Sequence, residues 1–142
     1  MKARIWTSVA AMALLCVCAV PASAQLAPAL SYALKLNLDT YNRRDLNATM
    51  RTIDSKSPDY ASTKAAVAAQ FQDSLDATAE LVDFTLIGHD DEFAVGRAKV
   101  KTTGKPGTGF TNNTVDAMVI FHQENGDWKL WDELILGAQT SP

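Results

Sequence analysis

Cysteine is almost absent from this sequence of 142 residues. The chain has two cysteines, Cys16 and Cys18, and both fall within its first 24 residues. That segment has the layout of a cleavable leader, so we expect the mature chain to lack cysteine. This expectation excludes a disulfide framework, a thiolate nucleophile and a metal site built from cysteines. The stability of the mature chain must then come from a packed core.

An apolar run long enough to cross a membrane is absent as well. The run over residues 9–20 is well short of the roughly 20 residues that a spanning helix needs, and Pro21 follows it directly. A basic start precedes this run, and small residues occupy the positions before a cleavage site after Ala24. The sequence therefore predicts a signal peptide over 1–24 and one exported domain over 25–142, periplasmic or secreted, with no membrane contact after cleavage.

Basic side chains are scarce relative to acidic ones. The chain has 13 lysines and arginines against 16 aspartates and glutamates, and Lys2 and Arg4 belong to the predicted leader. A net acidic domain without a concentrated basic face is a poor binder of nucleic acid. The two histidines, His89 and His122, lie near different predicted turns, which argues against a transition-metal centre. No phosphate loop or dinucleotide fingerprint is found, so we expect no cofactor and no metal.

Helical periodicity dominates the first half of the mature chain. Apolar residues recur at helical spacing from about 28 to 44, which predicts an amphipathic helix with Tyr41 on its inner face. Asp45 is suited to cap a second, short helix. The pair Ser57-Pro58 predicts the start of a third helix, with serine as its N-cap and proline at its first position.

The second half has the texture of β-structure. After Asp76, β-branched and aromatic residues alternate with polar ones, and clusters of glycine, asparagine and aspartate interrupt the pattern. The expected strands cover about 77–88, 92–103, 110–123 and 128–136. The short loops between them favour an antiparallel meander over parallel crossovers.

Three motifs accompany this order of elements: Tyr41-Asn42-Arg43-Arg44-Asp45, the stretch from Thr52-Ile53-Asp54 to Ser57-Pro58-Asp59-Tyr60, and Gly126-Asp127-Trp128-Lys129-Leu130. With them, residues 30–136 resemble the nuclear transport factor 2-like superfamily. The resemblance implies an α+β fold, in which three N-terminal helices pack on a curved four-stranded antiparallel sheet and form a cone-shaped pocket. Relatives include ketosteroid isomerase, polyketide-cyclase-like enzymes and binding modules, so the fold does not by itself imply a reaction.

The last two strands are joined by Asn125-Gly126, the strongest short signal for a two-residue hairpin turn. Such a turn places Glu124 opposite Asp127 and fixes every pair behind them. Counting back along both strands sets Asp132 opposite Val119. Asp132 is then the one acid on an otherwise apolar face.

The opposite face of this hairpin is too apolar to be fully solvated. It carries Met118, Ile120 and Trp131. Because proteins of the family that the chain resembles often pair across the outer face of the sheet, we expect a homodimer through these three residues. The alternative is a partly exposed face with scattered apolar side chains.

The first hairpin gives a similar pattern with a weaker turn signal. Placing Asp90-Asp91 at its tip sets Asp83 against Ala98, again one acid among small or apolar residues. The opposite face then pairs acidic with basic side chains, such as Glu80 with Lys101, and suits a solvated surface.

Asp83, Asp132 and Tyr41 are therefore the candidate catalytic residues. In the family that the chain resembles, ketosteroid isomerase works with carboxyl groups and a tyrosine in an apolar cone. Burial disfavours the charged form of a carboxylate, which turns it into a proton acceptor or a neutral donor. The structural alternative is that each acid meets a backbone N–H group, an arginine or solvent, and that Tyr41 belongs to the core.

Three functions are compatible with these features. The first is an exported domain that binds a small, largely apolar ligand or a protein partner without catalysis. The second is a cofactor-free proton-transfer enzyme of the isomerase, dehydratase or cyclase type, with Asp83 or Asp132 as the base and Tyr41 as the oxyanion donor. The third is a structural dimerisation module. A hollow cone with both acids facing it would favour the enzyme, whereas a filled core would favour the module.

Overall fold

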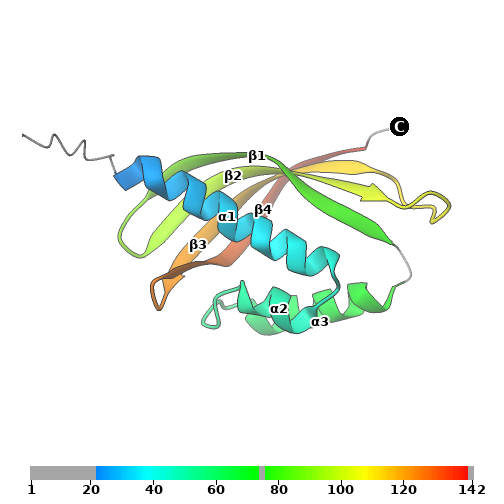
Figure 1. The fold of residues 1–142 in the computed structure, drawn as a ribbon, viewed down its shortest axis with the longest axis horizontal. Helices are drawn as coiled ribbons and strands as arrows, with labels where there is room; N and C mark the ends of the chain where they lie inside the picture. Colours follow the sequence, from blue (N-terminus) through cyan, green and yellow to red (C-terminus); the bar gives the residue numbers. More distant parts are fainter. Residues whose placement is uncertain (1–21, 74–75, 141–142) are drawn as a thin grey trace, which may run out of the picture.

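A computed structural model describes residues 22–73 and 76–140 of the chain. The predicted leader lies outside these residues except for its last three positions. The elements are α1 (Ala22–Asn42), α2 (Leu46–Arg51), α3 (Tyr60–Gln72), β1 (Ala77–His89), β2 (Phe93–Gly104), β3 (Asn113–Glu124) and β4 (Asp127–Thr140). Helix α1 lies across one face of the curved sheet. Helices α2 and α3 lie below α1 in the view of Figure 1. The predicted α+β fold, three helices followed by a four-stranded antiparallel sheet, is confirmed.

Helix α1 is longer than its periodicity predicts, because it begins at Ala22 and contains Pro28. Its inner face carries Leu30 and Leu34, which are buried against the sheet. At its C-terminal end, the Asn42 side chain donates a hydrogen bond to the Ala79 carbonyl and accepts one from the Ala79 N–H, each at 2.8 Å. These two bonds fix the end of α1 to the edge strand β1. No helix among residues 22–73 and 76–140 has both the length and the hydropathy that a membrane-spanning helix needs.

The starts of α2 and α3 differ in how well the sequence predicts them. The Asp45 side chain accepts a hydrogen bond from the Ala48 N–H at 2.8 Å, so this N-cap is confirmed. The predicted N-cap at Ser57 is wrong, because α3 begins at Tyr60. The Ser57 hydroxyl accepts the Asp59 N–H at 3.3 Å ahead of the helix and donates to the Trp131 carbonyl at 2.7 Å. A residue with the chemistry of a helix cap therefore fastens a loop to the sheet.

The four strands pair in sequence order. The turn at Asn125-Gly126 has positive φ at both residues, 54° and 90°, as a type I′ hairpin turn requires. Near the turn, the predicted pairs are confirmed: Glu124 lies opposite Asp127, and Phe121 lies opposite Leu130. Register shifts occur further along β4 and at two places in β1, and they decide which side chains face the helices.

One end of the space between helices and sheet is filled with large side chains. Phe121 is fully buried, and its ring meets that of Phe84 edge to face, with 6.0 Å between centroids. Gly96 makes room for this pair, because a Cβ atom at that position would lie 2.4 Å from the Phe84 ring. Leu30 and Leu130 complete the same cluster. This end supplies the packed core that a chain without disulfides needs.

The loop between α2 and α3 is fastened to β3 by a fully buried carboxylate and to β4 by a backbone bond. Asp54 Oδ2 lies 2.6 Å from His122 Nδ1, and Asp54 Oδ1 accepts the Lys56 N–H at 2.8 Å. The Asp54 N–H donates to the Leu130 carbonyl at 2.8 Å. The His122 ring in turn packs against Trp131, with centroids 4.9 Å apart. The loop, the histidine and the tryptophan therefore form one unit.

The variant Asp54→Ala should lower the free energy of unfolding by about 1–3 kcal/mol, because it leaves the His122 ring and the Lys56 N–H without their buried hydrogen-bond partner. Urea denaturation of the purified protein measures this loss. Asp91→Asn, at an exposed turn, is the matched control and should change stability by less than about 0.5 kcal/mol. Equal stability of the two variants would show that the Asp54–His122 pair does not hold the loop.

The outer face of the sheet carries an apolar patch made of Met118, Ile120, Trp131 and Leu134. Met118 lies opposite Leu134, whose side chain is 61% exposed. The homodimer expected through Ile120, Trp131 and Met118 stays a prediction.

If two copies pair through this patch, Leu134→Lys should give a folded monomer, because it places a charge at the centre of an apolar contact. Val82→Lys, equally exposed but on β1, should leave a dimer intact. Sedimentation velocity distinguishes the two states, and a wild-type chain that stays monomeric at high concentration would contradict the dimer.

Candidate functional site

The other end of the cone is hollow. A pocket of about 680 Å³ lies between the sheet and helices α1 and α3. Its floor on the sheet is made of small side chains, including Ala79, Ala98, Val100, Ala117 and Val119. Because none of these side chains is long enough to reach the helices, the space stays open. A pocket of this size with a mostly apolar lining is typical of small-molecule sites.

A register shift in β4 decides which acid enters this pocket. Phe121 pairs with Leu130, yet the next residue of β3, Ile120, pairs with Asp132 instead of Trp131. One extra residue in β4, Trp131, forms a bulge, and the side chains from 132 to 135 change face until a second shift at Leu136. Glu133 consequently lies opposite Val119 on the concave face.

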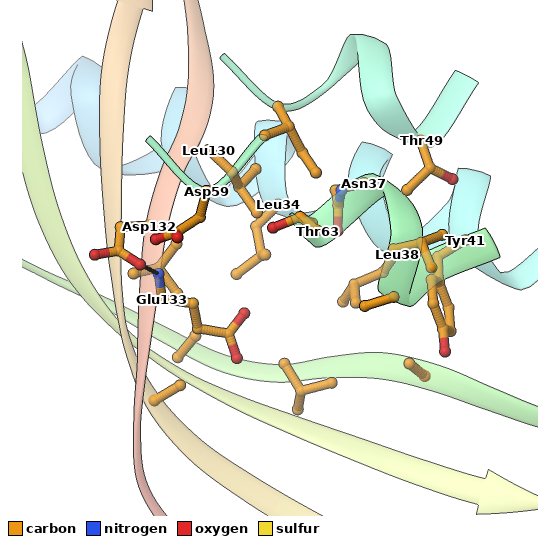
Figure 2. Close-up of a pocket in the computed structure, with 18 of the residues that line it drawn as sticks. Leu34, Asn37, Leu38, Tyr41, Thr49, Asp59, Thr63, Leu130, Asp132 and Glu133 are labelled. Atoms are coloured by element: carbon orange, nitrogen blue, oxygen red, sulfur yellow. Dashed lines mark hydrogen bonds between the residues drawn. The ribbon is translucent and has the colours of Figure 1, made fainter. Parts of the chain in front are cut away.

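Glu133 points into the pocket in Figure 2. Within the described residues, its carboxyl group has no hydrogen-bond or ion-pair partner. The pocket is open at this end, so the side chain stays accessible to solvent, but the surrounding protein displaces much of its water. This desolvation raises the pKa of Glu133 above its ordinary value of 4.5, and the neighbouring Asp132 carboxylate raises it further.

Asp132 does not lie where the sequence predicts. The expectation that it faces the concave side opposite Val119 is wrong, because the bulge pairs it with Ile120 on the outer face. Its side chain is exposed at the rim of the pocket, and its Oδ1 accepts the Glu133 N–H at 2.7 Å (Figure 2). Asp132 therefore acts on the pocket through its charge and by orienting the backbone of Glu133.

Asp83 lies outside the pocket. A register shift between Leu81 and Asp83 pairs Asp83 with Lys99 instead of Ala98. This pairing turns the Asp83 side chain to the exposed outer face, and Phe84 takes the inner position opposite Ala98. The expectation that Asp83 and Asp132 share the concave face with Tyr41 is therefore wrong.

Tyr41 does face inward, as predicted, and lines the pocket. Its hydroxyl donates a hydrogen bond to Gln70 Oε1 at 2.8 Å, and its ring packs against Phe71 with 5.2 Å between centroids. Burial raises the pKa of Tyr41, and the nearby Arg44 guanidinium partly offsets this effect. In Figure 2, Tyr41 and Glu133 lie at opposite ends of the pocket.

The charged groups of the lining are all acidic. Asp59, Asp132 and Glu133 line the pocket, and no lysine, arginine or histidine of the described chain does so. Asp59 precedes α3 but makes no side-chain capping bond to it. Residues 22–73 and 76–140 contain no cluster of histidine, cysteine and acidic side chains suited to hold a metal ion. Sequence reasoning missed Asp59 and Glu133, because neither stands out until the bulge and the loop are known.

The variant Glu133→Gln should be more stable than the wild type near neutral pH. A raised folded-state pKa means that the folded chain holds the proton more tightly, so this carboxyl group increasingly opposes folding as the pH rises from 4.5, and its effect levels off above the folded value. The advantage of the variant should therefore be absent in acid and present at pH 7. Urea denaturation at several pH values, with NMR titration of the Glu133 side chain, measures it. A lowered pKa together with a destabilised variant would contradict the desolvated position.

Solved structures share this architecture at low sequence identity. A protein of the NTF2-like family from Streptomyces avermitilis, to which a dehydratase activity is attributed, matches with a TM-score of 0.65 and 13% identity over 84% of this chain and 99% of that chain. A protein with a cystatin-like fold and unknown function from Nostoc punctiforme matches with a TM-score of 0.65 and 11% identity, over 85% and 93%. A ketosteroid isomerase-like protein from Erwinia carotovora atroseptica matches with a TM-score of 0.59 and 15% identity, over 82% of this chain and 97% of that chain. At these identities, the likeness shows the fold alone.

Comparison with curated proteins gives no match. One family model matches the chain over residues 32–140, namely the C-terminal domain of the anti-sigma-I factor RsgI9. This match begins within α1 and reaches the end of β4, so it covers the helices, the whole sheet and the pocket between them. The chain thus has an NTF2-like fold and belongs to the family of the anti-sigma-I factor RsgI9 C-terminal domain.

Proposed function

We propose that this protein is an exported domain that binds a small, largely apolar molecule in its cone without transforming it. The observation that carries the proposal is the hollow end of the cone, about 680 Å³ in volume. Small side chains on the sheet keep it open although larger ones would bury more apolar surface and stabilise the fold. A cavity that costs stability in this way is explained by an occupant.

The name of the family supports binding over turnover. The family is named after one domain of an anti-sigma factor, which is a regulatory protein. A domain that reports the presence of a ligand fits a regulatory role and needs no reaction. Among the described strand residues that face the concave side, Glu133 is the one acid, whereas two acids on that face were expected for the enzyme.

Export is supported by the leader pattern and by the start of α1. Pro28 has no N–H group, so within a helix it leaves the carbonyl four residues earlier without its bond. If the chain is cleaved after Ala24, Pro28 becomes the fourth residue, and the first four N–H groups of a helix have no intrahelical acceptor in any case. A mature helix that begins at Gln25 therefore accommodates this proline at little cost.

A cofactor-free proton-transfer enzyme is the second candidate. The observation that favours it is a carboxyl group of raised pKa in a mostly apolar pocket, Glu133. In that case Glu133 is the base that removes a proton next to a carbonyl group, and Tyr41, at the other end of the pocket, is not its oxyanion donor. The rate at which cyclohexanone takes up deuterium from the solvent distinguishes the two functions. If the protein only binds its ligand, this rate should be the same with the wild type and with Glu133→Gln. If it is an enzyme, the wild type should be faster.

The variant Val100→Phe should weaken binding of adamantan-1-ol, a compact apolar probe. Val100 lies on the floor of the pocket, and a larger side chain there occupies the space that the probe needs. We expect the dissociation constant to rise about tenfold or more, as measured by calorimetric titration.

Val95→Phe is the matched control, because Val95 lies on the same strand and pairs with Ile120 on the outer face. It should bind the probe as the wild type does. Equal weakening by both variants, or no binding of the probe to the wild type, would refute a ligand site inside the cone.

A further inference from the structure

We infer that the pocket selects apolar molecules that carry a positively charged amine, with the amine held by Glu133 at the acidic end of the cone. This inference rests on the proposed function, because it names the chemical class of the ligand that the same pocket would bind. It follows from the distribution of charge in the lining, the position of Glu133 and the apolar character of the rest of the pocket.

The charge of the lining is one-sided. Asp59 comes from the loop before α3, Asp132 and Glu133 come from β4, and Figure 2 shows all three at one end of the pocket. No lysine, arginine or histidine among the described residues lines the pocket. An anionic ligand would meet only repulsion at this end, whereas a cation would be attracted by every charged group of the lining.

Glu133 is the acidic group of the lining that a bound cation would stabilise most. Its carboxyl group reaches into the cavity and has no hydrogen-bond or ion-pair partner in the described part of the chain. A partly desolvated carboxylate without a partner is costly, and the adjacent Asp132 adds repulsion. An ammonium group beside Glu133 would supply up to three hydrogen-bond donors and an opposite charge. A neutral alcohol offers one donor and no charge.

The rest of the pocket accommodates an apolar body. Ala98, Ala117 and Val119 form the floor, and Leu34 and Leu38 of α1 face them. Tyr41 closes the end opposite Glu133, and its hydroxyl already donates to Gln70. The pocket therefore has one charged end and one apolar end. A molecule with an amine at one end of a compact hydrocarbon matches both.

Three probes with the same hydrocarbon cage test the inference: adamantan-1-amine, adamantan-1-ol and adamantane-1-carboxylate. Calorimetric titration into the purified protein at pH 7 gives the three dissociation constants. We expect the amine to bind about tenfold or more tightly than the alcohol, because a charge-assisted hydrogen bond is roughly twice as strong as a neutral one and adds to an attractive field. The carboxylate should bind most weakly.

The variant Glu133→Gln should reduce the preference for the amine over the alcohol to about threefold or less. The charges of Asp59 and Asp132 remain in this variant, while the charge of Glu133 is lost. Its affinity for the alcohol should stay within about twofold of the wild type. Glu80→Gln is the matched control, because Glu80 pairs with Lys101 on the outer face and does not line the pocket. It should keep the full preference of the wild type.

Proton release provides a second readout that needs no variant. A bound ammonium group lowers the pKa of Glu133, so binding of the amine near that pKa should release protons from the protein. Asp59, Asp132 and Tyr41 are the other titratable groups of the lining. Titration in two buffers of different ionisation enthalpy measures the protons released, and the alcohol should release none.

Equal affinity for amine and alcohol, or a preference for the carboxylate, would overturn the amine selectivity. The proposed function as an apolar binding site would still hold in that case. An unchanged preference in Glu133→Gln, or no proton release, would overturn the role of Glu133. If none of the three probes binds, the proposed function fails and the inference fails with it.

Discussion

One extra residue in β4 determines the chemistry of the pocket. The strand pairs regularly with β3 as far as Leu130 and then inserts Trp131, so that residues 132–135 lie on the faces opposite to those of a regular pairing, until a second shift at Leu136. Three bonds from the preceding loop lie at the first shift: the Asp54 N–H donates to the Leu130 carbonyl, the Leu130 N–H donates to the Thr52 carbonyl, and the Ser57 hydroxyl donates to the Trp131 carbonyl. Because β4 is an edge strand of the four-stranded sheet in the described part of the chain, these bonds satisfy backbone groups on its open side.

Aromatic side chains around Trp131 support the same shifted pairing of β3 and β4. The Trp131 ring packs against His122 and meets Phe93 edge to face, with centroids 5.5 Å apart. His122 is held in turn by the buried Asp54 carboxylate. Displacing Trp131 by one position would break these ring contacts and return Asp132 to the concave face. The loop, the aromatic cluster and the identity of the acid in the pocket are therefore coupled.

Large and small side chains divide the cone into two regions with different roles. Phe84, Phe121 and Leu30 fill one end at close packing and supply most of the core. Alanine and valine on the same sheet face leave the other end open. A fully filled cone would bury more apolar surface and be more stable, so the open end lowers the stability of the fold, as the proposed ligand site would require.

Much of the fold could be predicted from the sequence, because its signals are local. Helical spacing, the Asp45 cap and the Asn125-Gly126 turn each act within a few residues, and all three are found in the structure. The site could be predicted only in part. Tyr41 lines the pocket as expected, but the bulges at Val82 and Trp131 depend on contacts with distant segments, and neither lies next to a glycine or proline.

A shift of one residue reverses the face of every side chain beyond it, which is why Asp83 and Asp132 lie outside the position expected for them. Ser57 shows the same limit. Its position before a proline is typical of a helix cap, but the hydroxyl finds a better partner in a carbonyl 74 residues away. The local sequence indicates the bond that Ser57 accepts from the backbone N–H of Asp59, but not the bond that its hydroxyl donates to β4.

The most direct test of this account is to locate a bound molecule relative to the bulge. Nuclear Overhauser contacts between adamantan-1-amine and the protein, measured on a uniformly ¹³C-labelled sample, report which side chains lie within a few ångströms of the cage. The account predicts contacts to the methyl groups of Val100 and Val119 and to the side-chain protons of Glu133. Contacts to Met118 or Leu134 on the outer face instead, or contacts that place Asp132 rather than Glu133 beside the ligand, would contradict it.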